Sequence, residues 1–259
     1  MLVRAKKHLG QHFLKDLNIA ERIAGIIPEG IKNVLEIGSG MGVLTQFLLE
    51  NQSINLKAVE IDRDSVKYLQ EHFPKLDLIE NDFLKMDLNK VFNGEKFAII
   101  GNFPYNISSQ ILFKALENRH LVEFIGGMLQ KEVVERICAT EGNKTYGILS
   151  VLLQSYYRVS NLFAVSEHVF VPPPKVKSAV IALVRNKTKR LECNEDLFAK
   201  VVKTAFNQRR KIMRNSLKKF AESNNLTDFK EQIFNLRPEQ LNFSQFVSLT
   251  NLIETKMID

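Results

Sequence analysis

Residues 101–105, Gly-Asn-Phe-Pro-Tyr, bring an amide, a carbonyl stiffened by a proline ring and an aromatic hydroxyl together in one short segment. They follow the apolar run at residues 97–100, which predicts a buried strand that stops before Gly101, because proline cannot donate to a strand ladder. Asn102 and a backbone carbonyl can accept hydrogen bonds from an exocyclic amine, and Tyr105 can stack on a planar base. The segment therefore indicates a site for an adenine-like ring, although an ordinary turn explains Asn and Pro equally well.

A glycine-rich turn follows an earlier predicted strand. Residues 34–37, Val-Leu-Glu-Ile, are apolar except for Glu36, glycines stand at positions 38, 40 and 42, and a helical pattern begins at Val43. Strand, glycine turn and helix form the first unit of a doubly wound sheet, where glycines let the backbone approach a ligand. Val43 stands where a dinucleotide fingerprint has its third glycine, so the turn favours a cofactor without a pyrophosphate.

Two carboxylates follow the next two predicted strands. Glu60 lies at the end of the strand at residues 56–61, and Asp82 comes just after the strand at residues 76–79. A carboxylate about 20 residues after the glycine turn can accept from ribose hydroxyls, and Asp82 can accept from an adenine amine. Either residue by itself is a common loop acid. Together with Asn102 at the next strand end, they predict an S-adenosylmethionine site with the methyl acceptor beside it.

The elements that would position these side chains alternate between strands and helices. Residues 124–129 predict a fifth strand, residues 131–139 and 148–154 predict helices, and residues 155–165 and 176–184 predict a pair of strands. The sequence thus predicts an α/β fold: a Rossmann-like, class I S-adenosylmethionine-dependent methyltransferase sheet. We expect seven strands, mostly parallel, with an antiparallel last hairpin.

The segment at residues 169–175 connects the last two strands and contains three consecutive prolines. It carries one aromatic ring, Phe170, and one base, Lys175. Two interpretations of Phe170 stay open. It either packs inward, as a loop residue between strands does, or supplies a second ring that faces Tyr105 across a flipped base.

Positive charge is concentrated in the last third of the chain. The 259 residues carry 36 Lys and Arg against 29 Asp and Glu, a net charge of +7. Residues 185–219 hold twelve of these basic residues and three of the acids, so the remainder is slightly acidic. Such clustering is typical of proteins that bind a polyanion, and nucleic acid is favoured over membrane because no aromatic amphipathic anchor accompanies it. A solvated charged surface is the alternative.

After residue 187 the apolar residues recur only at helical spacing. We therefore expect two domains: residues 1–187, the methyltransferase domain with a basic N-terminal arm, and residues 188–259, a small all-α domain that recognises RNA. The arm lies on RNA, folds over the cofactor or is a solvated tail, and Asp16 predicts the N-cap of the helix after it. The expected RNA contacts are basic side chains of the arm, the proline segment and the helical domain: Arg4, Lys6, Lys7, Lys175, Arg209, Arg210, Lys211 and Arg214.

Composition excludes several classes of protein. Apolar runs stay well short of the roughly 20 residues that span a bilayer, and the first 15 residues lack the apolar core of a secretory signal. The two cysteines, Cys138 and Cys193, and the five histidines lack metal-ligand spacing. We expect a cytoplasmic monomer with reduced thiols and no metal.

These motifs together resemble those of the ribosomal small-subunit RNA adenine dimethyltransferases of the KsgA/RsmA type. The resemblance covers nearly the whole chain through eight motifs: Gly10-Gln-His-Phe-Leu-Lys-Asp, Glu36-Ile-Gly-Ser-Gly, Glu60-Ile-Asp, Asn81-Asp-Phe, Asn102-Phe-Pro-Tyr-Asn-Ile-Ser-Ser, Met128-Leu-Gln-Lys-Glu-Val, Phe170-x-Pro-Pro-Pro-Lys-Val-x-Ser-Ala-Val and Phe206-Asn-Gln-Arg-Arg-Lys. Two positions depart from the family pattern. His12 stands where the family often has Asn, and Phe103 where it often has Leu.

The resemblance implies roles for individual residues. The implied cofactor contacts are His12, Leu14, Gly38, Glu60, Asp82 and Asn102. The implied catalytic residues of the acceptor site are Asn102, Pro104 and Tyr105, with Phe170 as the facing ring. The implied reaction is the transfer of four methyl groups from S-adenosylmethionine, two to each of two adjacent adenosines in the 3′-terminal hairpin of 16S rRNA, during 30S ribosome biogenesis.

Two rival functions stay open. A large-subunit rRNA adenine methyltransferase of the macrolide-resistance type shares the Asn-x-Pro-Tyr pattern, but the motifs that begin at Met128 and Phe170 favour the small-subunit type. A ribosome-assembly factor whose binding matters more than its methylation is the second rival. A catalytically inactive variant that still supports subunit maturation would distinguish it.

Overall fold

The computed structural model describes residues 3–224 and 230–258. The chain divides into two compact units: the first extends to Val134 and includes Arg158–Arg185, and the second comprises Glu135–Tyr157 and the residues from Asn186 onward. The functional division into residues 1–187 and 188–259 stays a prediction.

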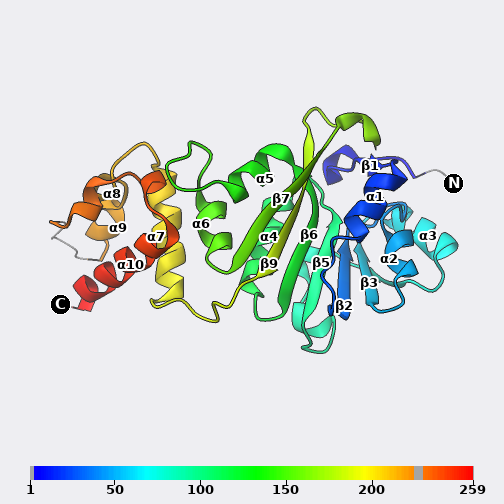
Figure 1. The fold of residues 1–259 in the computed structure, drawn as a ribbon, viewed down its shortest axis with the longest axis horizontal. Coiled ribbons are helices and arrows are strands. Elements are labelled where there is room, and N and C mark those ends of the chain that lie inside the picture. Colours follow the sequence, from blue (N-terminus) through cyan, green and yellow to red (C-terminus); the bar gives the residue numbers. More distant parts are fainter. Residues whose placement is uncertain (1–2, 225–229, 259) are drawn as a thin grey trace. The chain divides into compact units, whose positions relative to one another are not determined.

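A twisted sheet forms the framework of the first unit (Figure 1). Among the described residues it contains seven strands in the order β4-β3-β2-β5-β6-β9-β7. Strands β4 to β6 pair in parallel, whereas β9 runs antiparallel to β6. The bounds are β2 Asn33–Ile37, β3 Asn55–Glu60, β4 Asp77–Glu80, β5 Phe97–Asn102, β6 Val122–Gln130, β7 Tyr157–Val165 and β9 Ser178–Arg185. The predicted Rossmann-like fold class is confirmed.

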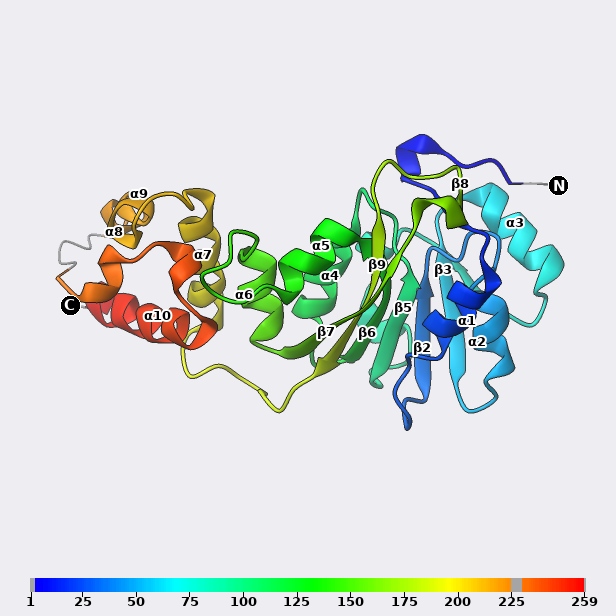
Figure 2. The ribbon, with the colours of Figure 1, turned by 45° about the horizontal axis from the view of Figure 1, so that its top comes forward.

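Helices flank and connect the parallel strands. Helix α1, Leu17–Ala24, precedes β2, and α5, Lys131–Cys138, follows β6. The connecting helices are α2 Thr45–Glu50, α3 Arg63–His72 and α4 Ser108–Glu117. Helix α1 begins as predicted, because the Asp16 side chain accepts from the Ile19 N–H at 3.1 Å. Helices α1 and α2 lie beside each other (Figure 2). Ala20, Ile23 and Leu48 from these helices belong to the same buried core as sheet residues such as Ile100.

Strand β5 extends two residues further than predicted. Gly101 and Asn102 still pair with Gly127 and Met128 of β6, so the strand ends only where the backbone turns at Phe103 and Pro104. A Cβ on Gly101 would lie 2.6 Å from the Ile37 carbonyl oxygen, so glycine lets β5 pass close to β2. The extension places the Asn102 side chain on a rigid ladder position instead of in a loop.

A second, two-stranded sheet joins the arm to the proline segment. Strand β1, Phe13–Leu14, pairs antiparallel with β8, Phe170–Val171. This pair could not be predicted from the sequence, because two-residue strands carry no periodic pattern. The pairing fixes the arm beside the carboxyl ends of the large sheet's strands.

The second unit is helical among its described residues. Its helices are α6 Ile148–Gln154, α7 Glu195–Asn207, α8 Met213–Ser216, α9 Lys218–Glu222 and α10 Phe243–Ile258. Apolar side chains at helical spacing, including Val201, Val202 and Phe246, are fully buried. Helix α6 was predicted with its observed bounds, but as part of the first domain; compactness groups it with α7 and α10.

Candidate active site

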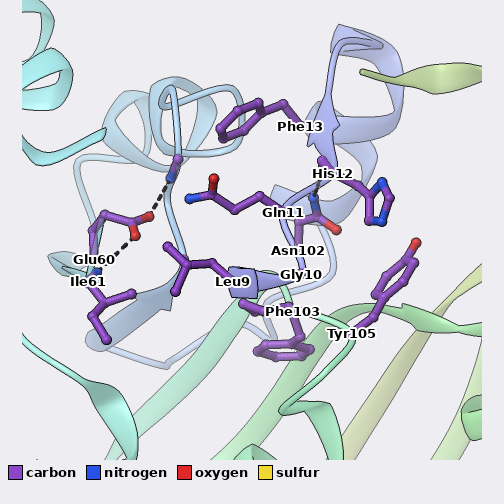
Figure 3. A pocket seen from close by; sticks show the side chains of 13 residues that line it. Leu9, Gly10, Gln11, His12, Phe13, Glu60, Ile61, Asn102, Phe103 and Tyr105 are labelled. Atoms are coloured by element: carbon purple, nitrogen blue, oxygen red, sulfur yellow. Dashed lines mark hydrogen bonds between the residues drawn. The ribbon is translucent and has the colours of Figure 1, made fainter. Parts of the chain in front are cut away.

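A cavity lies at the carboxyl ends of β2, β3 and β5, where open α/β sheets bind ligands (Figure 3). Residues from three strand ends and from the arm line it: Leu9, Gly10, Gln11, His12, Phe13, Gly38, Gly40, Glu60, Ile61, Asn102, Phe103, Pro104 and Tyr105. The structure therefore brings together the glycine turn, Glu60 and the segment at residues 101–105, which are far apart in sequence.

Backbone amides hold the Glu60 carboxylate at the end of β3. It accepts from the N–H groups of Gly40, Ile61 and Asp62, each at 2.9 Å. Burial raises the pKa of Glu60, while hydrogen bonds from the same three amides act in the opposite direction. Since three fixed donors surround a carboxylate with about four acceptor positions, its orientation is set before any ligand binds.

The glycine turn offers an unsatisfied donor. Ser39 Oγ is buried and makes no hydrogen bond of ordinary geometry with any residue that the structure describes, although it lies close enough to Glu36 to lower that carboxyl's pKa. Ser39 lines a smaller cavity that Leu14, Met41 and Asn102 also line. A buried polar atom in that state indicates a missing partner. Together with Glu60, this donor fits a ligand that carries both a ribose and a charged polar end.

Asn102 is held by the arm. Its Nδ2 donates to the His12 carbonyl oxygen at 3.0 Å. A carbonyl can only accept, so this bond fixes the amide nitrogen toward the arm and leaves Oδ1 as the acceptor. The orientation is the one needed to accept a hydrogen bond from an amine.

The Tyr105 ring is contacted at its tip and on one side. Its hydroxyl forms a hydrogen bond with Ser178 Oγ at the start of β9, and its ring lies 5.4 Å from the His12 ring at an interplanar angle of 31°. Burial raises the pKa of Tyr105, so the hydroxyl is neutral at physiological pH. His12 Nδ1 lies 2.8 Å from the Pro172 carbonyl oxygen. His12 thus bridges the acceptor segment and the proline segment.

The position of Phe170 agrees with the inward-packing alternative. Its side chain is 1% exposed, belongs to the main core and is absent from the cavity lining. The ring beside Tyr105 is the imidazole of His12 (Figure 3). A base between two rings needs two stacking intervals, about 9 Å or more in total, so the His12 ring must move before a base can lie there. The stacking role of Phe170 stays a prediction.

The arm is attached to the end of β3 by an ion pair. Lys6 contacts the Asp62 carboxylate and lies 2.7 Å from that of Asp64, while Gln11 donates to Asp62 at 2.9 Å. Burial acts to raise the pKa of Asp62, but hydrogen bonds from Lys6, Gln11 and the Asp64 amide hold it below its ordinary value. In the structure the Lys6 ammonium group fastens the arm, and the RNA contact expected of this side chain stays a prediction.

Asp82 lies outside the cavity lining. Its side chain accepts from the Leu84 N–H at 3.0 Å, capping a 3-10 helix, and lies 3.7 Å from Lys85 Nζ. An adenine contact by this carboxylate stays a prediction. Five lining residues received no site role from the sequence: Leu9, Gly10, Gln11, Phe13 and Ile61. The buried hydroxyl of Ser39 was also missed, although the glycine spacing around it could have indicated it.

The basic residues predicted to bind RNA have different environments. Arg4, Lys7, Lys175, Arg210, Lys211 and Arg214 are exposed. Arg209 instead donates to the Asn143 carbonyl oxygen at 3.1 Å and lies 3.6 Å from Glu239. Its guanidinium therefore helps to hold the second unit together, which competes with an RNA contact.

Two kinds of feature are absent from residues 3–224 and 230–258. No group of three His, Cys, Asp or Glu residues there could hold a metal ion. No helix in these ranges has the length and apolar character to cross a membrane. The expectation of metal-free chemistry stays a prediction.

Sequence comparison places the chain among known proteins. The family model described as ribosomal RNA adenine dimethylase matches residues 2–255. A protein of Bacteroides thetaiotaomicron named ribosomal RNA small subunit methyltransferase A is 57% identical over 259 residues, covering 98% of this chain and 95% of that protein. One of the same name from Flavobacterium johnsoniae is 55% identical over 255 residues and covers 97% of both chains.

Two solved structures of RNA methyltransferases also resemble this chain over most of its length. A dimethyladenosine transferase from Plasmodium falciparum has a TM-score of 0.75 and 25% identity, covering 95% of this chain and 98% of that one. The 23S rRNA methyltransferase ErmE has a TM-score of 0.66 and 25% identity, covering 92% of this chain and 99% of that one. The resemblance stated from the motifs is thus confirmed over nearly the full length.

Proposed function

The chain belongs to the ribosomal RNA adenine dimethylase family, and on that basis we propose that it dimethylates two adjacent adenosines in the 3′-terminal hairpin of 16S rRNA, using S-adenosylmethionine. One observation carries the proposal: the Asn102 amide stands at the edge of the cofactor cavity with its nitrogen fixed by the His12 carbonyl and its oxygen left to accept. An adenine amine presents the complementary donor.

Asn102 would act on the nucleophile. The lone pair of an adenine amine is delocalised into the ring, which makes the nitrogen a poor nucleophile. Acceptance of its hydrogens by Asn102 Oδ1 and by a carbonyl of Phe103 or Pro104 favours a pyramidal nitrogen, whose lone pair can then attack. Because these acceptors are in place before the base enters, alignment and preorganised dipoles supply much of the rate.

The residues present fit the cofactor. Glu60 is positioned for ribose hydroxyls, Ser39 and the glycine turn for the charged methionyl end, and Asn102 and Leu14 for the region between them. When bound, S-adenosylmethionine would supply a sulfonium methyl group: the new C–N bond replaces the S–CH3 bond, S-adenosylhomocysteine leaves, and the cationic product amine loses a proton to solvent. The phenol ring of Tyr105 would stack on the base and offset part of the few kcal/mol, roughly, that extraction of a base from a helix costs.

The second unit would recognise RNA. Arg210, Lys211 and Arg214 are exposed there, and Lys175 is exposed beside the acceptor site. Together with Arg4 and Lys7 they provide the positive charge that a phosphate backbone binds. The substrate would be an immature 30S subunit, met by a monomeric enzyme in the cytoplasm.

Methylation of purified particles tests the proposal. Tritiated S-adenosylmethionine is incubated with immature small subunits, and the modified nucleotides are mapped. Incorporation into two neighbouring adenosines of the 3′-terminal hairpin is expected. Incorporation only into naked 23S rRNA would instead support the large-subunit rival, whose fold is also similar.

A rescue experiment tests the second rival. An Asn102→Ala variant is expressed in cells that lack the enzyme, and small-subunit maturation is followed. Failure to rescue is expected if methylation is the important activity. Full rescue without methylation would assign the main role to binding.

A further inference from the structure

The hydrogen bond between Tyr105 and Ser178 joins two parts of the first unit that are 73 residues apart in sequence. Tyr105 lies in the turn between β5 and α4, whereas Ser178 is the first residue of β9. The Ser178 side chain is 0% exposed, so its hydroxyl has little access to water as an alternative partner. The contact is therefore a specific one between the acceptor turn and the sheet.

Ser178 is the more rigid of the two partners. Its backbone is registered against Gln130 at the end of β6, and the neighbouring Lys177 carbonyl accepts from the Lys131 N–H at 2.9 Å. Strand β6 also carries Met128, the ladder partner of Asn102. Pairing with the same strand, β6, thus fixes the backbone positions of both Ser178 and Asn102.

The Tyr105 ring needs a contact with a rigid element to fix its orientation. Its backbone follows a proline in a turn, and site residues on loops are held less accurately than those on strands. The His12 ring contacts it from one side at 5.4 Å, and a base that stacks on that side must displace the His12 ring. After displacement the hydrogen bond at the hydroxyl still restrains the ring.

We propose that Ser178 is a positioning residue for base stacking: its hydroxyl holds the Tyr105 ring at the angle that aligns the target adenine with Asn102. The inference rests on the proposed function, because it gives Tyr105 its place in the acceptor site. Tyr105 is neutral, so either hydroxyl can donate in this bond.

A double-mutant cycle tests the inference. Wild type, Ser178→Ala, Tyr105→Phe and the double variant are compared for kcat and for the KM of S-adenosylmethionine with small subunits as acceptor. Ser178→Ala is expected to lower kcat about three- to tenfold, the range of one hydrogen bond, without changing the KM of the cofactor. In the Tyr105→Phe background the same substitution is expected to change kcat less than about twofold, because the partner hydroxyl is already gone.

Ser65→Ala is the matched control, since Ser65 of α3 is also fully buried and its hydroxyl has no hydrogen-bond partner among the described residues. Its kcat is expected to equal that of wild type. Equal losses from Ser178→Ala in both backgrounds, or no loss in either, would overturn the inference. Thermal melting of each variant separates misfolding from mispositioning.

The Tyr105→Ala variant, compared with wild type, distinguishes failure of the proposed function from failure of the positioning role of Ser178. If this variant retains normal turnover, Tyr105 has no stacking role and the inference about Ser178 fails, whereas the proposed methylation stands. If wild type itself transfers no methyl group to small subunits, the proposed function fails. If Tyr105→Ala is inactive while Ser178→Ala and Tyr105→Phe are unaffected, only the positioning role of Ser178 is excluded.

Discussion

The sheet edge of the first unit and the basic turn between α7 and α8 of the second position their polar side chains by different means. At the sheet edge, Glu60 accepts from three backbone amides and Asn102 donates to a backbone carbonyl, so each group has one orientation. In the second unit Arg210 and Lys211 are exposed on long, rotatable side chains. The first arrangement suits chemistry that depends on alignment, and the second suits a phosphate backbone that depends on charge.

This difference determines which residue types tolerate change. A group fixed by buried hydrogen bonds loses its role when the partner or the atom itself is removed, and it can leave an unsatisfied polar group behind. A surface charge contributes in proportion to the number of phosphates it neutralises. Substitutions in the first unit should therefore act sharply on catalysis, and those in the second gradually on affinity.

Asn102→Ala should have the largest effect. Removal of a preorganised acceptor is expected to lower kcat about 10²- to 10³-fold, the magnitude seen when one oxyanion-hole donor is deleted. RNA affinity, measured by filter binding, should stay close to that of wild type. Asn89→Ala is the control, since Asn89 is exposed and remote from the cavity lining. Near-normal turnover of Asn102→Ala would remove Asn102 from the mechanism.

Glu36→Gln should change how stability depends on pH. Burial raises the pKa of Glu36 from 4.5 to about 7, so the folded protein binds this proton more tightly than the unfolded chain. The protonated carboxyl stabilises the fold below about pH 4.5, and this contribution is lost as the pH rises to about 7. The loss amounts to about 3 kcal/mol of unfolding free energy, at about 1.4 kcal/mol per unit.

Denaturant titrations from below the unfolded pKa of Glu36 to above its folded pKa measure this effect. Wild type should lose stability relative to Glu36→Gln as the pH rises, because glutamine carries no titrating proton. Glu29→Gln, at an exposed position, should follow wild type. Parallel curves for wild type and Glu36→Gln would show that burial of Glu36 does not perturb its ionisation.

Neutralising Arg210 and Lys211 together should have a moderate effect on binding. The slope of log affinity against log salt concentration is expected to fall by roughly 0.7 to 0.9 for each phosphate that these side chains no longer neutralise. Turnover at saturating RNA should not change. Lys96→Gln, an exposed lysine of the first unit, is the charge control. An unchanged slope would exclude the turn between α7 and α8 from the RNA-binding surface.

Lys6→Gln should have the smallest effect and distinguishes two roles for the arm. Since Lys6 fastens the arm to Asp62 and Asp64, its loss is expected to raise the KM of S-adenosylmethionine by up to about fivefold, the upper range for a partly exposed ion pair. The salt dependence of RNA binding should not change. If the slope of log affinity against log salt concentration falls and the KM of S-adenosylmethionine does not change, the result supports the RNA contact predicted for Lys6 from the sequence.

Much of the site could be predicted from the sequence because chain order and strand polarity suffice for it. Glu60 and Asn102 end their strands and the glycine turn follows one, and the carboxyl ends of parallel strands share one edge. Asp82 follows a strand as well, but its carboxylate caps a 3-10 helix through the Leu84 N–H and pairs with Lys85, and it does not line the cavity. Strand polarity therefore predicts which edge of the sheet a residue lies on, but it does not predict the direction in which its side chain points.

The sequence by itself determined the fold class, the helix that begins at Asp16 and the family, since these depend on periodicity, capping and ordered motifs. Only the tertiary structure decided that β1 pairs with β8, that His12 lies against Tyr105 and that Ser178 meets the Tyr105 hydroxyl. Such contacts join residues separated by 73 to 160 positions, and no local pattern encodes them. They form because packing of the whole sheet brings their partners within hydrogen-bond distance.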